Sequence, residues 1–354
     1  RGAPVRERQK VVEQFWKDGI LNTASNVQFG EGGAGTFSDG KLNTLVKDKF
    51  GRNRFVLETF VKFGAPEEIL WESKPHIGTD ILIEVVERMR EEIIRLGGEF
   101  LFHSQVTDIL PKENCLIVNG CHRIETDAAV FAVGHSARDT FQMLFDRNVA
   151  MKSKSFAIGV RAEHRQDMID EAMYGRKERG PLGAAAYKLT AQLENGRGVY
   201  TFCMCPGGFI VPAMTRSGES VVNGMSPSGR NSVYANSGIV TEIRPEDFAH
   251  LRAAHGELAG LRFQQQLEEL AYAQVGDRQV APGQRLADFV RGTASKTLPK
   301  CSYVPGVAPT EVHRWLPPFI SGALRGGFAA FDRKMRGFLT NEALVVGVES
   351  RTSS

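Results

Sequence analysis

The stretch "NVQFGEGGAGTFSDGKLNT", residues 26–44, decides which fold the sequence predicts. Its glycines spell G-x-G-x-x-G over 30–35, a pattern that binds a pyrophosphate when a strand leads in and a helix starts at the third glycine. Here the lead-in is short, Gly40 interrupts helical spacing, and the downstream "LVKDKFGRNRF" is charged and does not resemble a strand ending in an acid. The context argues against the fingerprint and predicts a loop that exposes its main chain.

The loop also carries small hydrogen-bonding side chains and one cation, namely Thr36, Ser38, Asp39 and Lys41. Glycines without a Cβ let a flat or phosphorylated ligand approach the main chain closely. A tight surface loop with a solvated lysine is the alternative interpretation. The residues alone leave both open.

Composition describes an ordinary globular protein. The 354 residues are 42% hydrophobic and 24% charged, which suggests two domains or one domain with an insertion. A net charge of +3 is too small to indicate nucleic acid or a membrane surface. No apolar run reaches the roughly 18 residues of a membrane span, and the five cysteines are an odd number. We therefore expect reduced thiols and a cytoplasmic location, or the plastid stroma if the source is a plant.

Hydrophobic periodicity predicts an alternation of helices and strands. Helices are predicted over residues 5–18, 53–63, 80–96, 136–147, 257–275 and 318–336, and Thr79 or Asp80 is expected to cap the third. Strands are predicted at 99–103, 105–110, 128–134 (buried), in a β-rich segment from about 153, and at 342–350. Asn119-Gly120 predicts a type I′ turn in a hairpin within 115–126. The proline- and glycine-rich segment 281–318 is predicted to be an ordered crossing loop.

Four further stretches, taken with the opening loop, resemble a known family. They are "KPHIGTD" (74–80), "FAVGHSARDTF" (131–141), "FCMCPGG" (202–208) and "VNGMSPSGRN" (222–231). Together they resemble the uncharacterised FAD-dependent dehydrogenases of bacteria and plastids, within the glutathione-reductase-like flavoprotein superfamily. The resemblance implies an α/β fold: a partial glutathione-reductase-type FAD-binding domain (1–152 and 296–354) with an inserted β-rich α+β domain (153–295).

The resemblance also implies a cofactor site for FAD. "TDAAVFAVG", 126–134, looks like the segment that returns to the cofactor-binding sheet, and Val106 lies where main chain often meets the adenine. The implied cofactor-binding residues are Gly32, Gly33, Ala34, Gly35, Thr36, Ser38, Asp39, Lys41, Val106, Gly134 and His135. NAD(P)H is a candidate electron donor, although the sequence holds no second fingerprint for it.

Two departures from the family pattern concern the ends of the sequence. Family members carry a true G-x-G-x-x-G before the Arg-Gly at which this chain opens, and a glycine-rich segment after "SRTSS". The chain therefore looks like the middle of a flavoprotein, and we expect it to bind FAD weakly or not at all by itself.

The candidates for chemistry are Cys203, Cys205 and His76. Cys203 and Cys205 are two positions apart on a predicted strand, so we expect both on one side, as buried strand residues or lining the substrate side of the flavin. A zinc site needs four ligands and a second cysteine pair is missing, so no metal is predicted. Each histidine, His76 and His135, is either structural or a ligand contact.

Arg138 and Asp139 begin a predicted helix. They are expected either to form a cap with a surface ion pair or to contact phosphate.

Two functions follow from different classes of protein. The first is an FAD-dependent oxidoreductase that acts on an unidentified small molecule, with this chain as its middle portion. The alternative is a non-catalytic, flavoprotein-derived binding module without cofactor. Neither includes a nucleic-acid or membrane partner, and the sequence does not determine the oligomeric state.

Overall fold

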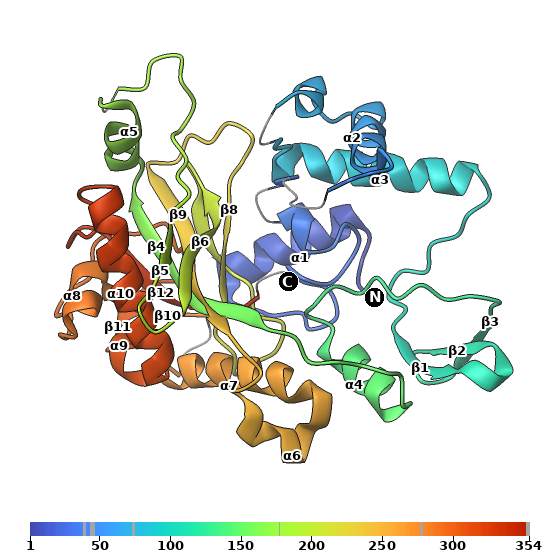
Figure 1. The fold of residues 1–354 in the computed structure, drawn as a ribbon. Coiled ribbons are helices and arrows are strands. Elements are labelled where there is room, and N and C mark those ends of the chain that lie inside the picture. Colours follow the sequence, from blue (N-terminus) through green and yellow to red (C-terminus); the bar gives the residue numbers. More distant parts are fainter. Residues whose placement is uncertain (38–39, 43–46, 73–74, 177, 277–278, 352–354) are drawn as a thin grey trace.

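The computed structural model describes residues 1–37, 40–42, 47–72, 75–176, 178–276 and 279–351 (Figure 1). It is a mixed α/β structure with three sheets in the described part of the chain: a seven-stranded sheet, a three-stranded antiparallel sheet and a two-stranded ribbon. Helices surround them, so the predicted α/β class is confirmed. The glutathione-reductase type of the first domain stays a prediction.

The large sheet has the strand order β11-β10-β12-β4-β9-β6-β5. Its long pair, β4 (Phe156–Arg165) and β9 (Tyr234–Ile243), runs antiparallel, and the pairing of β10 with β11 is parallel. The other strands are β5 (Thr190–Gln192), β6 (Gly198–Cys205), β10 (Ala281–Arg285), β11 (Val307–Pro309) and β12 (Leu344–Glu349). The strands β7 (Phe209–Pro212) and β8 (Val222–Met225) form the ribbon beside it.

Strand β4 shows how the sheet is buried on both faces. Ile158, Val160 and Ala162 alternate onto the face that packs against helices α7 (Ala259–Ala273) and α10 (Pro318–Lys334). Figure 1 shows α10 alongside the sheet and α7 below it. The intervening Arg161 and Glu163 are also buried, so this strand carries charged side chains into the interior.

The N-terminal part forms the other side of the molecule in Figure 1. Helix α1 (Val5–Asp18) packs against α3 (Thr79–Arg95) through Val12, Phe15 and Ile83, and α2 (Arg52–Lys62) lies beyond them. The strands β1 (Val106–Leu110), β2 (Cys115–Val118) and β3 (His122–Glu125) make the small sheet. The shorter helices are α4 (Arg138–Asp146), α5 (Gln166–Tyr174), α6 (Arg252–His255), α8 (Leu286–Arg291) and α9 (Val312–Trp315).

Most predicted elements are confirmed. All six helices form within a few residues of their expected bounds, and Gly19 ends α1 in the left-handed conformation at φ 76°. Asn119 and Gly120 have φ values of 52° and 78°, as a type I′ turn requires. The final strand forms as β12. Among the described helices, none is both long and apolar enough to cross a bilayer.

Three local expectations are wrong. Residues 99–103 form no strand. Neither Thr79 nor Asp80 caps α3; the cap position is Gly78, and the Asp80 carboxylate instead accepts a hydrogen bond from the Ser228 hydroxyl at 2.7 Å. Residues 281–318 are not one crossing loop, because they contain β10, β11, α8 and α9.

The segment 128–134 is also not a buried strand. It forms neither strand nor helix and is exposed, with Val130 93% accessible. Apolar β-branched residues favour a buried strand, but they pair only where a neighbouring strand is present. The predicted domain bounds at 152 and 295 stay predictions; β12, beyond the second bound, lies in the sheet between β10 and β4.

Candidate functional site

A cavity of about 650 Å³ lies between the N-terminal loop, the small sheet and the start of α4. Three segments line most of it: 28–34 without Glu31, 104–106, and 128–137. Leu116 and Ile124 of the small sheet add apolar surface. This volume is within the usual range for small-molecule and cofactor sites.

The glycine loop brings main chain to the cavity wall. Gly33 has φ 61°, and no atom lies within 4 Å of the place a Cβ would occupy. Gly32 has φ 83°, and a Cβ there would lie 2.0 Å from the hydroxyl oxygen of Thr36. Position 33 therefore favours glycine because of its backbone conformation. Position 32 requires glycine for the same reason and also because Thr36 approaches so closely. The short helix Ala34–Phe37 follows at once.

Thr36 and His135 each bury a polar atom without a partner. No hydrogen-bonding group among the described residues reaches Thr36 Oγ1 or His135 Nε2. Burial, reinforced by the positive charge of Arg351, lowers the pKa of His135 to about 4, so its ring is neutral at physiological pH. Gly134 beside it has φ 69° and an open face, so a ligand could approach its main chain closely. Unpaired buried polar atoms are uncommon. Of Thr36 and His135, only His135 lines the cavity, so only there could a bound group supply the missing partner.

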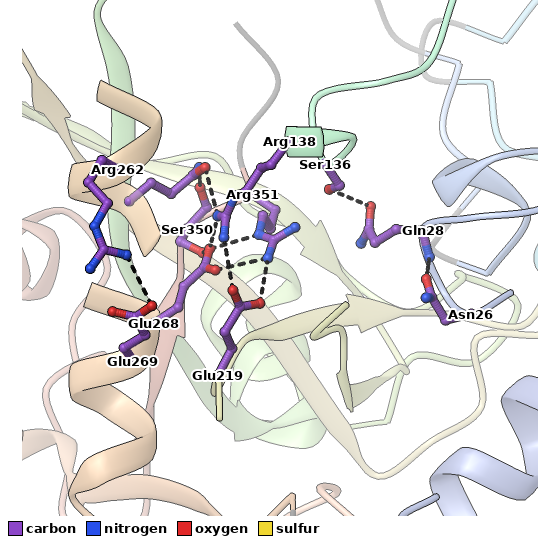
Figure 2. Close-up of polar contacts among 11 residues, drawn as sticks. Asn26, Gln28, Ser136, Arg138, Glu219, Arg262, Glu268, Glu269, Ser350 and Arg351 are labelled. Carbon is purple, nitrogen blue, oxygen red and sulfur yellow. Dashed lines mark hydrogen bonds and ion pairs between the residues drawn. The ribbon is translucent and has the colours of Figure 1, made fainter. Parts of the chain in front are cut away.

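Two arginines and two glutamates form a buried cluster (Figure 2). Arg138 at the start of α4 contacts Glu219 at 3.1 Å and Glu268 of α7 at 2.9 Å. Arg351 contacts the same two carboxylates at 3.3 and 2.7 Å. Four segments distant in sequence therefore meet here, and each charge has two opposite neighbours.

The two carboxylates titrate differently despite sharing their partners. Glu268 is fully buried, which opposes its charge, but hydrogen bonds and the charges of Arg351 and Arg138 lower its pKa to about 2. Burial and then the nearby Glu268 carboxylate raise the pKa of Glu219 to about 7. The two carboxylates therefore titrate as one coupled pair, in which Glu268 holds its charge more strongly than Glu219.

The sequence expectation for Arg138 as a helix cap is wrong, because α4 has no side-chain cap and Arg138 is 6% exposed within the cluster. Asp139 does form an ion pair, with Arg1. Glu219, Glu268 and Arg351 were not foreseen, since no short motif links them. Ser136, two residues before Arg138, donates to Gln28 in the cavity wall at 3.2 Å, which ties the cluster to the cavity (Figure 2).

The residues predicted to take part in chemistry, His76, Cys203 and Cys205, lie together with Lys41 at the end of β6, outside the cavity lining. Lys41 pairs with His76 in an isolated antiparallel bridge, and its Nζ donates to the main-chain oxygen of Met204. Cys203 and Cys205 do not share one side: Cys203 is exposed at φ 43°, and Cys205 is buried. The reason is an irregularity in the β6–β9 pairing between Phe202 and Cys205, which breaks the two-residue alternation.

The buried side chain of Arg161 contacts the end of β6 that carries the two cysteines. Arg161 is fully buried and contacts Glu349 at 2.6 Å and Asn236 Oδ1 at 2.8 Å. It also donates to the main-chain oxygen of Cys203 and lies 3.4 Å from the Cys205 sulfur. The interior charge of β4 thus fixes the main chain that carries both cysteines.

The predicted cofactor residues divide by position. Gly32, Gly33, Ala34, Val106, Gly134 and His135 line the cavity. Gly35, Thr36 and Lys41 do not, and neither do His76, Cys203 and Cys205. Ser38 and Asp39 lie outside the described residues. In the described ranges, no group of three or more histidine, cysteine, aspartate or glutamate side chains is placed to hold a metal ion.

Comparison with known proteins adds the family. Residues 155–352, more than half of the chain, match the family described as "FAD-dependent protein, C-terminal domain-like". The whole chain is also 47% identical over 361 residues to a protein of Clostridium beijerinckii whose printed name is "Uncharacterized protein". The chain spans 66% of the length of that relative. The chain therefore belongs to the family of FAD-dependent proteins that this C-terminal domain defines.

Proposed function

We propose that the protein containing this chain is an FAD-dependent oxidoreductase that acts on a small molecule. The observation that carries the proposal is the cavity formed by Gly32–Ala34, Val106 and Gly134–His135, in a chain whose family is FAD-dependent. These segments are far apart in the sequence, and the family match itself covers only the later part. The cavity therefore supports the proposal independently of the family match.

The residues present fit such a cofactor. Gly33 and Gly134 offer open main chain on which a flat ring can lie, and Leu116 and Ile124 supply apolar contact. His135 Nε2 is buried with no partner in the described residues, so it can exchange a hydrogen bond with a bound polar edge. When bound, FAD supplies the two-electron chemistry, and the protein supplies binding and orientation.

The chemistry residues remain candidates. Lys41, His76 and Cys203 come together at the end of β6 but outside the cavity lining. An exposed thiol and a loop lysine at the same place could position a substrate, and this role for them belongs to the proposal. The identity of the electron donor, including NAD(P)H, also stays a prediction.

The test is an FAD titration of the full-length protein after removal of bound flavin. Gly134→Val places a branched side chain in the open cavity face at φ 69°, and Gly196→Val places the same side chain in a distant hairpin at φ 75°, also with open space. Both variants carry the same backbone strain, but only the first fills the cavity. We expect FAD to bind Gly134→Val at least about tenfold more weakly, a loss of ~1.4 kcal/mol. Equal FAD affinity in the two variants would overturn the assignment of the cavity.

A further inference from the structure

A second cavity, of about 370 Å³, adjoins the first and shares part of its wall. Arg1, Phe29, Gln105 and Ser136 line both spaces. The second cavity differs in its chemistry, because arginines and hydroxyl groups line it where the first has glycines and apolar side chains. Of its other lining residues, Arg138 and Asp139 were expected either to form a cap with a surface ion pair or to contact phosphate, and the rest entered no expected site.

Two arginines of this cavity each bury an N–H group that has no acceptor. Arg138 uses both terminal nitrogens in the buried cluster, yet its Nε finds no partner among the described residues. The Nε of Arg1 is likewise buried and unpaired within the described chain, although Nη1 pairs with Asp139. A guanidinium stays protonated, so its Nε–H always remains a donor. Burying that donor without an acceptor destabilises the folded state by about 1–3 kcal/mol. Both side chains line the same space, so one ligand could satisfy both.

The charge balance of the cavity favours an anion. Arg138 is compensated within the cluster, and Arg1 is compensated by Asp139. Arg216 remains: it is exposed at the rim and forms no ion pair with any described residue, so it adds a positive charge. Ser136, which precedes the nine-residue helix α4, and Asp139 in its first turn also line the cavity, and helix N-termini favour negative groups.

We propose that this second cavity binds the anionic oxygen group, carboxylate or phosphate, of a small acidic substrate beside the cofactor cavity. Arg1 and Arg138 donate their free Nε–H groups, Arg216 supplies net charge, and Thr23, Thr215 and Ser217 supply hydroxyls. The role as a substrate site rests on the proposed function; the binding of an anion does not. The 370 Å³ volume accommodates a small acid but not a second dinucleotide.

The experiment is calorimetric titration of the full-length protein, first freed of FAD and then after addition of saturating FAD, with inorganic phosphate and, separately, with succinate, at low ionic strength. The test variant is Arg216→Gln, because this side chain is exposed and outside the buried cluster. The matched control is Arg333→Gln, an exposed arginine on α10, across the molecule in Figure 1. We expect saturable binding of at least one probe, weakened about tenfold or more by Arg216→Gln and unchanged by Arg333→Gln.

Different failures are distinguishable. No saturable binding with or without FAD, or equal weakening in both variants, overturns the anion site. Phosphate that competes with FAD and no longer binds once FAD is loaded shows that the cofactor's own phosphates occupy the cavity, which overturns the substrate assignment while leaving the FAD function intact. Saturable, Arg216-dependent binding in a protein that takes up no FAD supports the anion site and refutes the proposed function.

Discussion

Replacing Glu268 by Gln tests whether the buried cluster is held by paired charge. The carboxylate is fully buried and accepts from Arg351 at 2.7 and 2.9 Å and from Arg138 at 2.9 Å. Glutamine keeps the shape but removes the negative charge and turns an N–H₂ group toward a guanidinium. Two arginines then share the single carboxylate of Glu219. Breaking a buried pair in this way costs about 3–5 kcal/mol.

The neighbouring Glu269 provides the matched control on the same helix. Its carboxylate contacts Arg262 at 3.1 Å, with 31% and 41% of the two side chains exposed, so Glu269→Gln should cost no more than ~1 kcal/mol (Figure 2). Urea unfolding followed by circular dichroism at neutral pH measures both variants in the same transition. We expect a large drop in the midpoint for Glu268→Gln alone. Midpoints that fall equally, or an unchanged Glu268→Gln, would refute the reasoning.

Three further predictions follow from single positions. Gly32→Ala forces a Cβ against the Thr36 hydroxyl at φ 83°, so the melting temperature should fall, and Gly32→Ala in a Thr36→Ala background should lose less; equal losses in both backgrounds would contradict the contact. Folded His135 has its pKa lowered from 6.5 to about 4, so stability should fall as pH drops from about 6.5 towards 4, and less steeply in His135→Gln; identical pH slopes in thermal melts would contradict this. Native-state alkylation mapped by mass spectrometry should modify exposed Cys203 well before buried Cys205, and the reverse order would contradict the irregularity in β6.

The sequence predicted elements wherever the signal was local. The apolar stripe of α1, the left-handed Gly19 and the turn at Asn119-Gly120 depend only on nearby residues, and all formed as expected. Proline and glycine misled the prediction for 281–318. Gly283 lies inside β10, where a Cβ would meet Val307 at 2.3 Å, so this glycine serves close strand packing and does not form a turn.

Contacts between distant segments could not be predicted. Glu219, Glu268 and Arg351 meet Arg138 only because a loop, a helix and the end of the chain converge after folding. Apolar composition at 128–134 indicated a strand but could not show whether another strand lies beside it. Gly32–Ala34 of the glycine-rich loop line the large cavity, and their contact with a cofactor stays a prediction.

The most direct test of the central claim is the visible spectrum of the full-length protein as purified. The proposal predicts the near-ultraviolet and blue absorption bands of an oxidised flavin, in a ratio of one FAD per chain, and bleaching of the blue band on anaerobic reduction. A well-folded protein that is colourless and stays so after incubation with FAD would contradict it.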